Sequence, residues 1–133
     1  MPAIERDLYS KYKAHANFVC AYVEEAHATD EWPISSARYN HGKVVRIKQP
    51  QTDAERVRVG LAFKDHFALT MPMFVDSPEL KNPFEKAYAP WPLRLYVIEN
   101  GKLTWIAEPK NCTYDASQLA AFLDSRIAQR KMM

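Results

Sequence analysis

The hydrophobic residues of this chain follow two patterns, stripes at helical spacing and short uninterrupted runs. The first stripe consists of Ile4, Leu8 and Tyr12, which recur at every fourth position and predict a helix near the N-terminus. The first uninterrupted run, from Phe18 to Val23, shows no alternation of apolar and polar residues. Such a run is typical of a strand covered on both faces, as in a parallel sheet flanked by helices.

The middle of the chain contains a capping signal followed by a second helical stripe. Thr52 and Glu55 have the spacing of a capping box, which predicts that a helix of about fifteen residues begins there. The apolar residues of this helix that we expect to face the core are Val57, Leu61 and Phe67. Residues 43–49 predict a short edge strand before the helix, and residues 73–76 predict a short strand after it.

The last third of the chain predicts a short helix, a hairpin and a closing helix. Asn82 and Pro83 favour the start of the short helix, since proline is tolerated in the first helical turn. Residues 93–107 contain two strand-like runs joined by Asn100 and Gly101, a dipeptide that accepts positive φ at both turn positions. Asp115 is the expected cap of the closing helix. The apolar faces of the two helices are Phe84 with Tyr88, and Leu119 with Phe122, Leu123 and Ile127.

The order of these elements is helix, strand, helix, strand, short helix, strand, hairpin strand, helix. Parallel strand and helix units that give way to a hairpin and a closing helix predict an α/β protein with a thioredoxin-like fold. At 133 residues the chain has the length of one domain, so we expect residues 1–133 to form a single thioredoxin-like domain. Pro92 precedes the first hairpin strand, where thioredoxin-like folds place a cis-proline, although it equally fits a proline that ends the preceding helix.

Composition and charge favour a protein of a reducing compartment and indicate no macromolecular partner. The 18 basic and 16 acidic residues are spread along the chain, which leaves no basic face for nucleic acid. No apolar run approaches the roughly 20 residues that span a membrane, and the charged N-terminus lacks the apolar core of a signal peptide. The 2 cysteines show no CxxC spacing, so we expect a cytoplasmic protein. The 4 histidines show no spacing of a metal site, and we expect no cofactor.

The strand predicted at residues 18–23 leads directly into a titratable segment that reads EEAHATDE from position 24. Many α/β proteins present their chemistry at the carboxyl ends of strands, so Glu24 and His27 are candidate catalytic residues. Histidine titrates in the range that acid and base catalysis uses, although a histidine at a strand end is more often a local hydrogen-bonding residue. We expect Glu25 to be a solvated neighbour, because adjacent strand residues point to opposite sides.

The two cysteines differ in the surroundings that the sequence predicts. Cys20 lies within the apolar run of residues 18–23, where a cysteine behaves as a small buried hydrophobe. Cys112 lies in a polar stretch near Lys110, and a nearby positive charge favours the thiolate. Cys112 is therefore the candidate redox thiol.

The segment YVEEAHATDEW resembles the YxEEAHxSDxW segment of the iodothyronine deiodinase family. The resemblance continues through VVRIKQPQTDAERVRV, MPMFVD, AYAPWPLRLYVIENGKL and YDASQLAAFL, and so covers nearly the whole chain. It implies a thioredoxin-like fold related to peroxiredoxins, and reductive chemistry at a selenocysteine, or a cysteine in some members, in a motif of the type CTxPPF. It also implies that Glu24 and His27 lie beside the redox residue and the substrate, and that His41 lies where members carry a second substrate-binding histidine.

The sequence departs from the family pattern in two respects. It contains no motif of the type CTxPPF, so we expect a redox selenocysteine or cysteine, with the strand that carries it, upstream of Met1. A UGA codon for selenocysteine that was read as a stop would explain this start. Near the last helix, Pro109 stands at the position of a family arginine and Lys110 beside it, and lysine lacks the planar fork that pairs with a carboxylate. We therefore treat Lys110 as a candidate substrate-binding residue, together with His41, Pro92 and Trp32, although a tryptophan at position 32 more often anchors the loop than binds a ligand.

An absent central strand has physical consequences for the strands beside it. In the thioredoxin-like sheet that the resemblance implies, it would lie between residues 18–23 and 93–98, and its absence would leave edges that pair with other strands. The remaining chain would then be marginally stable, pair residues 18–23 directly with 93–98, or be completed by a strand from another copy; of these we expect a homodimer. Two functions fit the resemblance. The first is a deiodinase-like oxidoreductase that takes a halogenated aromatic compound or a peroxide as substrate and a thiol as reductant. The second is a catalytically inactive thioredoxin-fold module that binds a ligand or partner in the same cleft.

Overall fold

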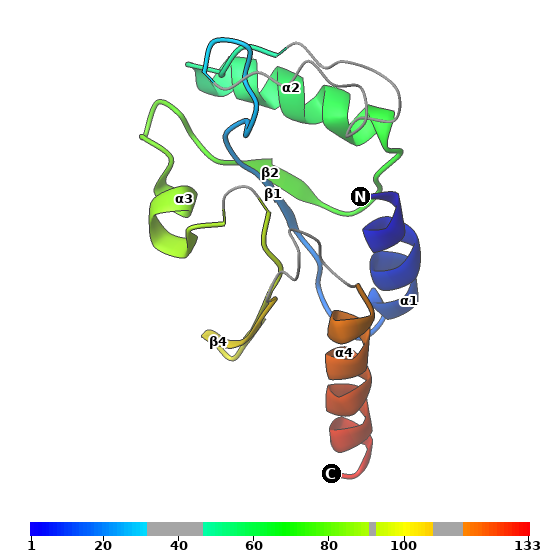
Figure 1. Cartoon of the computed structure of the whole chain (residues 1–133). Coiled ribbons are helices and arrows are strands. Elements are labelled where there is room, and N and C mark those ends of the chain that lie inside the picture. Colours follow the sequence, from blue (N-terminus) through cyan, green and yellow to red (C-terminus); the bar gives the residue numbers. More distant parts are fainter. Residues whose placement is uncertain (32–46, 91–92, 108–115) are drawn as a thin grey trace. The chain divides into compact units, whose positions relative to one another are not determined.

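The structure is a computed structural model that describes residues 1–31, 47–90, 93–107 and 116–133 (Figure 1). It contains η1 (Ile4–Tyr9), α1 (Ser10–Tyr12), β1 (Cys20–Tyr22), α2 (Asp53–His66), β2 (Met73–Val75), α3 (Pro83–Tyr88), β3 (Tyr96–Glu99), β4 (Lys102–Ile106) and α4 (Ala116–Lys131). The first helix therefore begins with a π-helical segment. The predicted α/β class and the predicted order of helices and strands are confirmed. That the chain forms a single domain stays a prediction.

The described strands form two separate pairs. In the first pair the N–H of Cys20 donates to the carbonyl of Pro72 over 2.8 Å, and the N–H of Asp76 donates to the carbonyl of Tyr22 over 2.9 Å. Residue numbers rise in the same direction on both strands, so β1 and β2 are parallel. In the second pair β3 and β4 are antiparallel, with Val97 opposite Trp105. Among the residues described, no strand joins one pair to the other, and the expected central vacancy stays a prediction.

The chain divides into two compact units, of which the first comprises residues 1–20, 63–73 and 94–133. Its core forms where Leu8 and Tyr12 pack against Leu119 and Leu123 of α4, and each of these side chains is at most 8% exposed. The helical stripes predicted at both ends of the chain are therefore confirmed as core faces. Figure 1 shows the N-terminal helix and α4 lying alongside each other within this unit.

The hairpin of the first unit turns at the predicted dipeptide. Asn100 has a φ of 51° and Gly101 a φ of 77°, which is the left-handed pair of residues that a tight hairpin turn requires. Trp105 of β4 lies 6.0 Å from Phe122 of α4 between ring centroids, and Arg126 of α4 pairs with Glu99 at 3.1 Å. The hairpin therefore packs on the same helix that closes the core.

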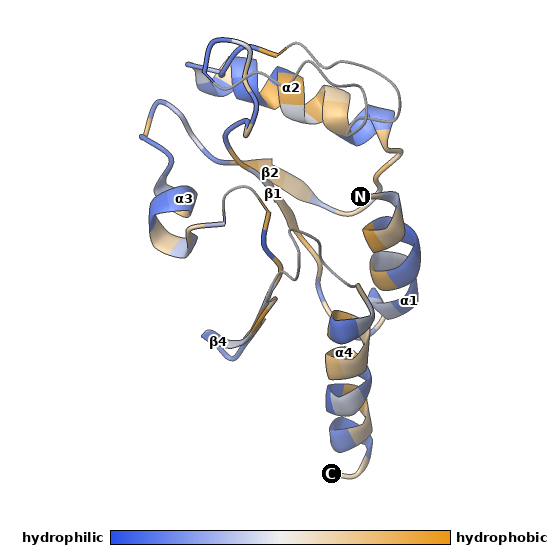
Figure 2. Ribbon diagram, viewed as in Figure 1, coloured by the Kyte–Doolittle hydropathy of each residue, from blue (hydrophilic) through white to orange (hydrophobic). Residues whose placement is uncertain are grey.

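The second unit comprises residues 21–62 and 74–93, and α2 begins within it. The predicted capping box is confirmed, because the N–H of Glu55 donates to Thr52 Oγ1 over 3.1 Å and the N–H of Thr52 donates to Glu55 Oε2 over 3.4 Å. Figure 2 shows polar residues in the first turn of α2 and apolar residues in its middle.

The inward face of α2 differs from the one that its apolar residues predict. Val57 is 43% exposed and Leu61 is 57% exposed, whereas Arg56 and Gly60, one turn apart, are buried. The guanidinium of Arg56 has polar partners inside the unit, which offset the cost of burying its charge. The helix therefore turns its Arg56 face inward, and the expectation that Val57 and Leu61 face the core is wrong.

The short helix α3 begins at Pro83 as predicted, but Asn82 does not cap it with its side chain. The carboxylate of Asp76, at the end of β2, accepts hydrogen bonds from the N–H groups of Phe84 and Glu85, each over 2.9 Å. The predicted shared face of α3 is confirmed by the stacked rings of Phe84 and Tyr88, whose centroids lie 4.6 Å apart. The end of the expected edge strand that the structure describes, residues 47–49, is irregular.

Candidate functional site

The candidate site of the second unit begins where β1 ends. Tyr22 is the last residue of β1, and its hydroxyl donates a hydrogen bond to the Oε1 of Glu25. Glu25 is half-buried, and burial raises the pKa of its carboxyl, while the Tyr22 hydroxyl and the positive charge of Arg56 act in the opposite sense. The expectation that Glu25 is a solvated neighbour is therefore wrong. The chain leaves the strand at Tyr22, so the alternation of strand side chains no longer applies at Glu25.

Arg56 brings a buried positive charge to this unit from the first turns of α2. Its side chain is 1% exposed, and its Nη1 donates to the carbonyl oxygen of Asp76 over 2.9 Å and to the Oδ1 of Asn82. Its Nε has no hydrogen-bond partner among the described residues. The guanidinium thus ties α2 to the residues between β2 and α3.

Asp76 joins three elements around the same point. Its N–H donates to the carbonyl of Tyr22 at the end of β1, its own carbonyl accepts from Arg56, and its carboxylate receives two N–H groups of α3. Asp76 is 2% exposed, so each of these bonds is shielded from water. A buried network therefore holds the main chain at Tyr22 in place. The Tyr22 side chain, with its hydroxyl, projects from this fixed main chain.

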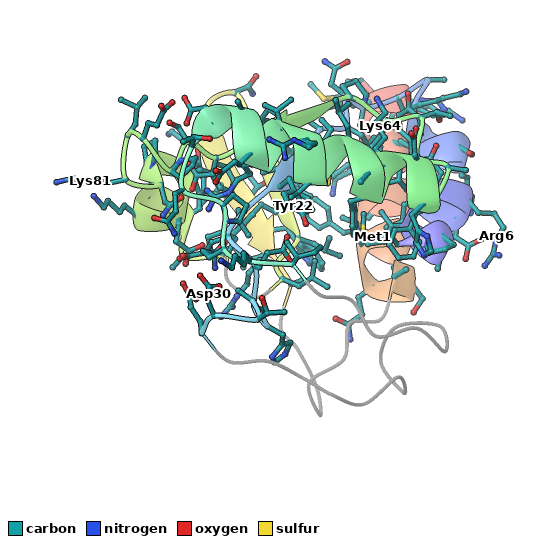
Figure 3. All side chains as sticks on the ribbon, turned by 90° about the horizontal axis from the view of Figure 1, so that it is seen from above. Met1, Arg6, Tyr22, Asp30, Lys64 and Lys81 are labelled. Carbon is teal, nitrogen blue, oxygen red and sulfur yellow. The ribbon has the colours of Figure 1, made fainter. Side chains whose placement is uncertain are left out.

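Gln49 holds the main chain of Glu25 from the other side. Its side-chain amide is 6% exposed, its Oε1 accepts the N–H of Glu25 over 2.9 Å, and its Nε2 donates to the carbonyl of Glu25 over 3.0 Å. Figure 3 shows Tyr22 beneath α2 and Asp30 on the loop that follows β1. The N–H of Gln49 donates to the carboxylate of Asp30 over 2.9 Å, so the same residue contacts the far end of that loop.

The structure describes some of the sequence-predicted site residues and not others. Glu24 and His27 are half-buried and flank Glu25 in the loop that follows β1, and their catalytic roles stay predictions. Cys20 lies in β1, and burial raises the pKa of its thiol, as expected for a cysteine that acts as a small hydrophobe. The candidates that lie outside the described residues are Trp32, His41, Pro92, Lys110 and Cys112.

The sequence interpretation missed five residues of this network, namely Tyr22, Glu25, Gln49, Arg56 and Asp76. A signal for the first two exists in the sequence, because a tyrosine that ends a strand reaches a carboxylate three residues later when the chain turns. Gln49 has no such local signal, since its partner Glu25 is 24 positions away. A buried arginine on a helix is likewise invisible to an apolar pattern.

Within the described ranges, no group of three or more histidine, cysteine, aspartate or glutamate side chains has the arrangement to hold a metal ion. In the same part of the chain, no helix combines the length and apolarity that crossing a membrane requires. The site as described is therefore a constellation of acid, hydroxyl and guanidinium groups.

These observations define an α/β protein that presents a half-buried carboxyl group, hydrogen-bonded to a tyrosine hydroxyl, after the carboxyl end of a parallel strand. Residues 1–127 match the family model described as Iodothyronine deiodinase. The chain belongs to the iodothyronine deiodinase family, and the resemblance that its motifs carry is confirmed.

Curated relatives match the chain along most of its length. It is similar to the thyroxine 5-deiodinase of Gallus gallus, with 30% identity over 119 residues that cover 90% of this chain and 43% of the relative. It is also similar to the type I iodothyronine deiodinase of Xenopus laevis, with 23% identity over 119 residues, 90% of this chain and 43% of the relative. The type II iodothyronine deiodinase of Homo sapiens is 21% identical over 130 residues, 98% of this chain and 46% of the relative. The chain thus spans less than half the length of these relatives.

Proposed function

We propose that residues 1–133 act as one deiodinase-like domain of an oxidoreductase, with a halogenated aromatic compound as substrate and a thiol as electron donor. The proposal rests on family membership and on one observation above all, the half-buried Glu25 that accepts a hydrogen bond from Tyr22. Because burial raises the pKa of this carboxyl, the group holds a proton at a higher pH than a solvated glutamate does. A group of this kind is suited to donate protons.

The proposed reaction needs a nucleophile for the halogen and a proton for the carbon. A selenol or thiol attacks the halogen and takes it from the aromatic carbon, and the carbon then receives a proton where the halogen was bound. A second thiol then displaces the halide from the chalcogen and gives up its proton, so that a selenol and a thiol end as a selenenyl sulfide, or two thiols as a disulfide, and two electrons reach the substrate. In this scheme His27, Glu24 and Glu25 are the candidate proton donors.

The redox residue of this scheme is the part that the chain does not carry in a recognisable motif. We propose that a selenocysteine or cysteine upstream of Met1 supplies it, as the family resemblance implies. The placement rests on the family resemblance; the sequence itself contains no CTxPPF-type motif, and the relatives are longer than the region that they share with this chain. Peroxide reduction by the same chalcogen is the second reaction that this site would support.

The test is to express the upstream-extended reading frame with cysteine at the predicted redox position and to assay it beside the 133-residue chain. We expect thiol-dependent release of iodide from an iodinated aromatic substrate by the extended protein alone, with peroxide consumption measured in parallel. Peroxide consumption without iodide release would assign the site to peroxide reduction. Equal inactivity of both proteins would overturn the enzymatic proposal and favour a binding module.

The two adjacent glutamates offer a matched pair for the same assay. We expect Glu25→Gln in the extended protein to lower kcat by about 10²-fold or more, which is the usual contribution of a positioned acid. Glu24→Gln, at the neighbouring position, is the control for a general loss of negative charge. The reverse ranking would assign the proton donor to Glu24, and equal, small effects would leave His27 as the donor.

We also propose that the protein works as a homodimer. Within the described ranges each sheet has two strands, β1 with β2 and β3 with β4, and the edges of so small a sheet can pair with another chain. Light scattering after size exclusion measures the mass directly. A monomer at all concentrations up to the millimolar range would contradict this proposal and leave the proposed chemistry untouched.

A further inference from the structure

The side-chain amide and the main-chain N–H of Gln49 form hydrogen bonds with one loop, residues 25–31. Together these bonds hold the loop as a clamp would. The side-chain amide forms two hydrogen bonds with the main chain of Glu25, one as acceptor and one as donor. Two bonds to the same residue fix both its position and its orientation, which a single bond does not. The Glu25 side chain projects from that clamped main chain to the Tyr22 hydroxyl.

The same glutamine residue also holds the other end of the loop. Its Nε2 lies 3.2 Å from Glu31 Oε2, and its main-chain N–H donates to Asp30 Oδ1 over 2.9 Å. Two positions before Gln49, the carbonyl of Ile47 accepts the N–H of Thr29 over 2.8 Å. The loop from residue 25 to residue 31 is therefore attached at both ends to residues 47–49, and His27 lies between the attachment points.

A glutamine side chain has the hydrogen-bonding groups that position 49 requires. A buried amide must find partners for one acceptor and two donors, and Glu25 and Glu31 supply the partners that Gln49 needs at 6% exposure. Glutamate would keep the acceptor for the Glu25 N–H but lose both donor bonds. Methionine would keep the length of the side chain and lose all three bonds.

We propose that Gln49 is a positioning residue that fixes the loop of Glu25 and His27 for the reaction of this site. The inference rests on the proposed function for its catalytic meaning, but its structural content concerns only the chain itself. Gln49 touches no reacting atom in this scheme and acts through the main chain of Glu25. A merely structural residue would lower stability without changing the titration of Glu25.

The first test is nuclear magnetic resonance on the 133-residue chain with Gln49→Met, Gln49→Glu and the exposed control Lys48→Gln. The readouts are the pH titration of the Glu25 side-chain carboxyl and hydrogen exchange of the Glu25 N–H. The charged or titratable groups near Glu25 are Tyr22, Glu24, His27, Asp30, Glu31 and Arg56. Gln49→Met and Lys48→Gln leave all of them unchanged, whereas Gln49→Glu adds one carboxylate to them.

In Gln49→Met we expect the Glu25 pKa to fall toward its ordinary value, because the freed loop admits water, and the Glu25 N–H to exchange at least about tenfold faster. Gln49→Glu keeps the acceptor, so protection of that N–H is retained in part. Signals of the β3 and β4 hairpin, in the other unit, report whether the variants are folded. An unchanged Glu25 titration in folded Gln49→Met would overturn the proposal, and so would equal effects of Lys48→Gln. If Gln49→Met does not fold, Gln49→Glu tests the proposal in its place. In that variant, an unchanged Glu25 titration together with unchanged hydrogen exchange of the Glu25 N–H would overturn the proposal.

The second test separates the inference from the proposed function. In the extended protein we expect Gln49→Met to lower kcat about ten- to a hundredfold with a nearly unchanged KM, since misplaced groups slow the chemical step more than binding. If the extended protein with Gln49 is inactive while the Glu25 titration still shifts in the variant, the proposed function fails and the clamp stands. If the extended protein is active and Gln49→Met is as active as its parent, the positioning role fails and the proposed function stands.

Discussion

Glu24 and Glu25 are identical residues at adjacent positions, yet the structure gives them different surroundings. Glu25 accepts the Tyr22 hydroxyl through its side chain, and Gln49 binds its main chain. The spacing of apolar and polar residues does not distinguish the two glutamates, because the distinction arises where β1 ends. It ends at Tyr22, before the run of apolar residues does, and the chain then turns toward Gln49.

The titration of Glu25 predicts a change in the pH dependence of stability. Burial raises the pKa of Glu25 above its unfolded value, so over the interval between the two values the folded chain binds a proton that the unfolded chain has released. The contribution of the Glu25 carboxyl to the free energy of unfolding is therefore fully present below about pH 4, and it is lost as the pH rises through the pKa that Glu25 has in the folded chain. We expect urea unfolding of Glu25→Gln to show a smaller decrease in stability from pH 4 to pH 7 than the parent does.

Glu24→Gln is the matched control for this experiment, because it removes the same charge one position away. We expect its pH profile to follow that of the parent more closely than the profile of Glu25→Gln does. A Glu25→Gln profile parallel to that of the parent would mean that Glu25 titrates in the folded chain as it does in the unfolded one.

At the scale of elements, apolar spacing predicted which segments form helices and strands, and failed where a polar residue is buried. Leu8 and Tyr12 lie in the core, as their stripe predicted, because both residues are apolar and lie one turn apart. The stripe of α2 does not, because Arg56 has buried partners in Asp76 and Asn82. Those partners lie 20 and 26 positions away, and no local pattern contains that information.

The hairpin turn provides a prediction about backbone conformation alone. Gly101 has a φ of 77°, and a Cβ built there would meet no atom within 4 Å. Gly101→Ala therefore adds conformational strain without a collision, and we expect a loss of about 1 kcal/mol in the free energy of unfolding. Lys102→Ala, at the next position of the same hairpin, is the control with an expected change near zero. A neutral Gly101→Ala would mean that the turn adopts another conformation in solution.

We expect a larger loss of stability when the buried guanidinium of Arg56 is removed than when Gly101 is replaced. Arg56→Met keeps much of the side-chain volume of Arg56 and removes its bonds to the Asp76 carbonyl and the Asn82 side chain. The two acceptors then stay buried without this donor, so we expect a loss of about 2–3 kcal/mol in the free energy of unfolding.

Arg58→Met is the control on the same helix, because Arg58 is exposed, and we expect a change within about 0.5 kcal/mol. Chemical denaturation followed by circular dichroism measures both variants. Equal effects of the two substitutions would show that the bonds of Arg56 add nothing to stability beyond those of a surface arginine.

At the scale of the whole molecule, the two units carry different kinds of interaction. The first unit is built on an apolar core between its N-terminal helix and α4, and the second on the buried polar network of Arg56, Asp76 and Gln49. The apolar unit was accessible from the sequence, because hydrophobic periodicity reports apolar contacts. For the second unit the sequence predicted only the order of helices and strands. Its buried hydrogen bonds join residues that are distant in the chain, and no local pattern predicts them.

The proposed upstream strand makes a prediction about the molecule as a whole. If a strand from the extended reading frame pairs with β1 and β3, the amides of these strands gain hydrogen-bond partners and apolar surface leaves water. We expect the extended protein to unfold with a steeper dependence on urea than the 133-residue chain, since the slope scales with the surface that unfolding exposes. Hydrogen exchange at the amides of Ile98 and Ala21 is expected to slow in parallel. Identical slopes and identical exchange in the two proteins would mean that the upstream segment folds apart from these strands, and the redox residue would then have no fixed place beside Glu25.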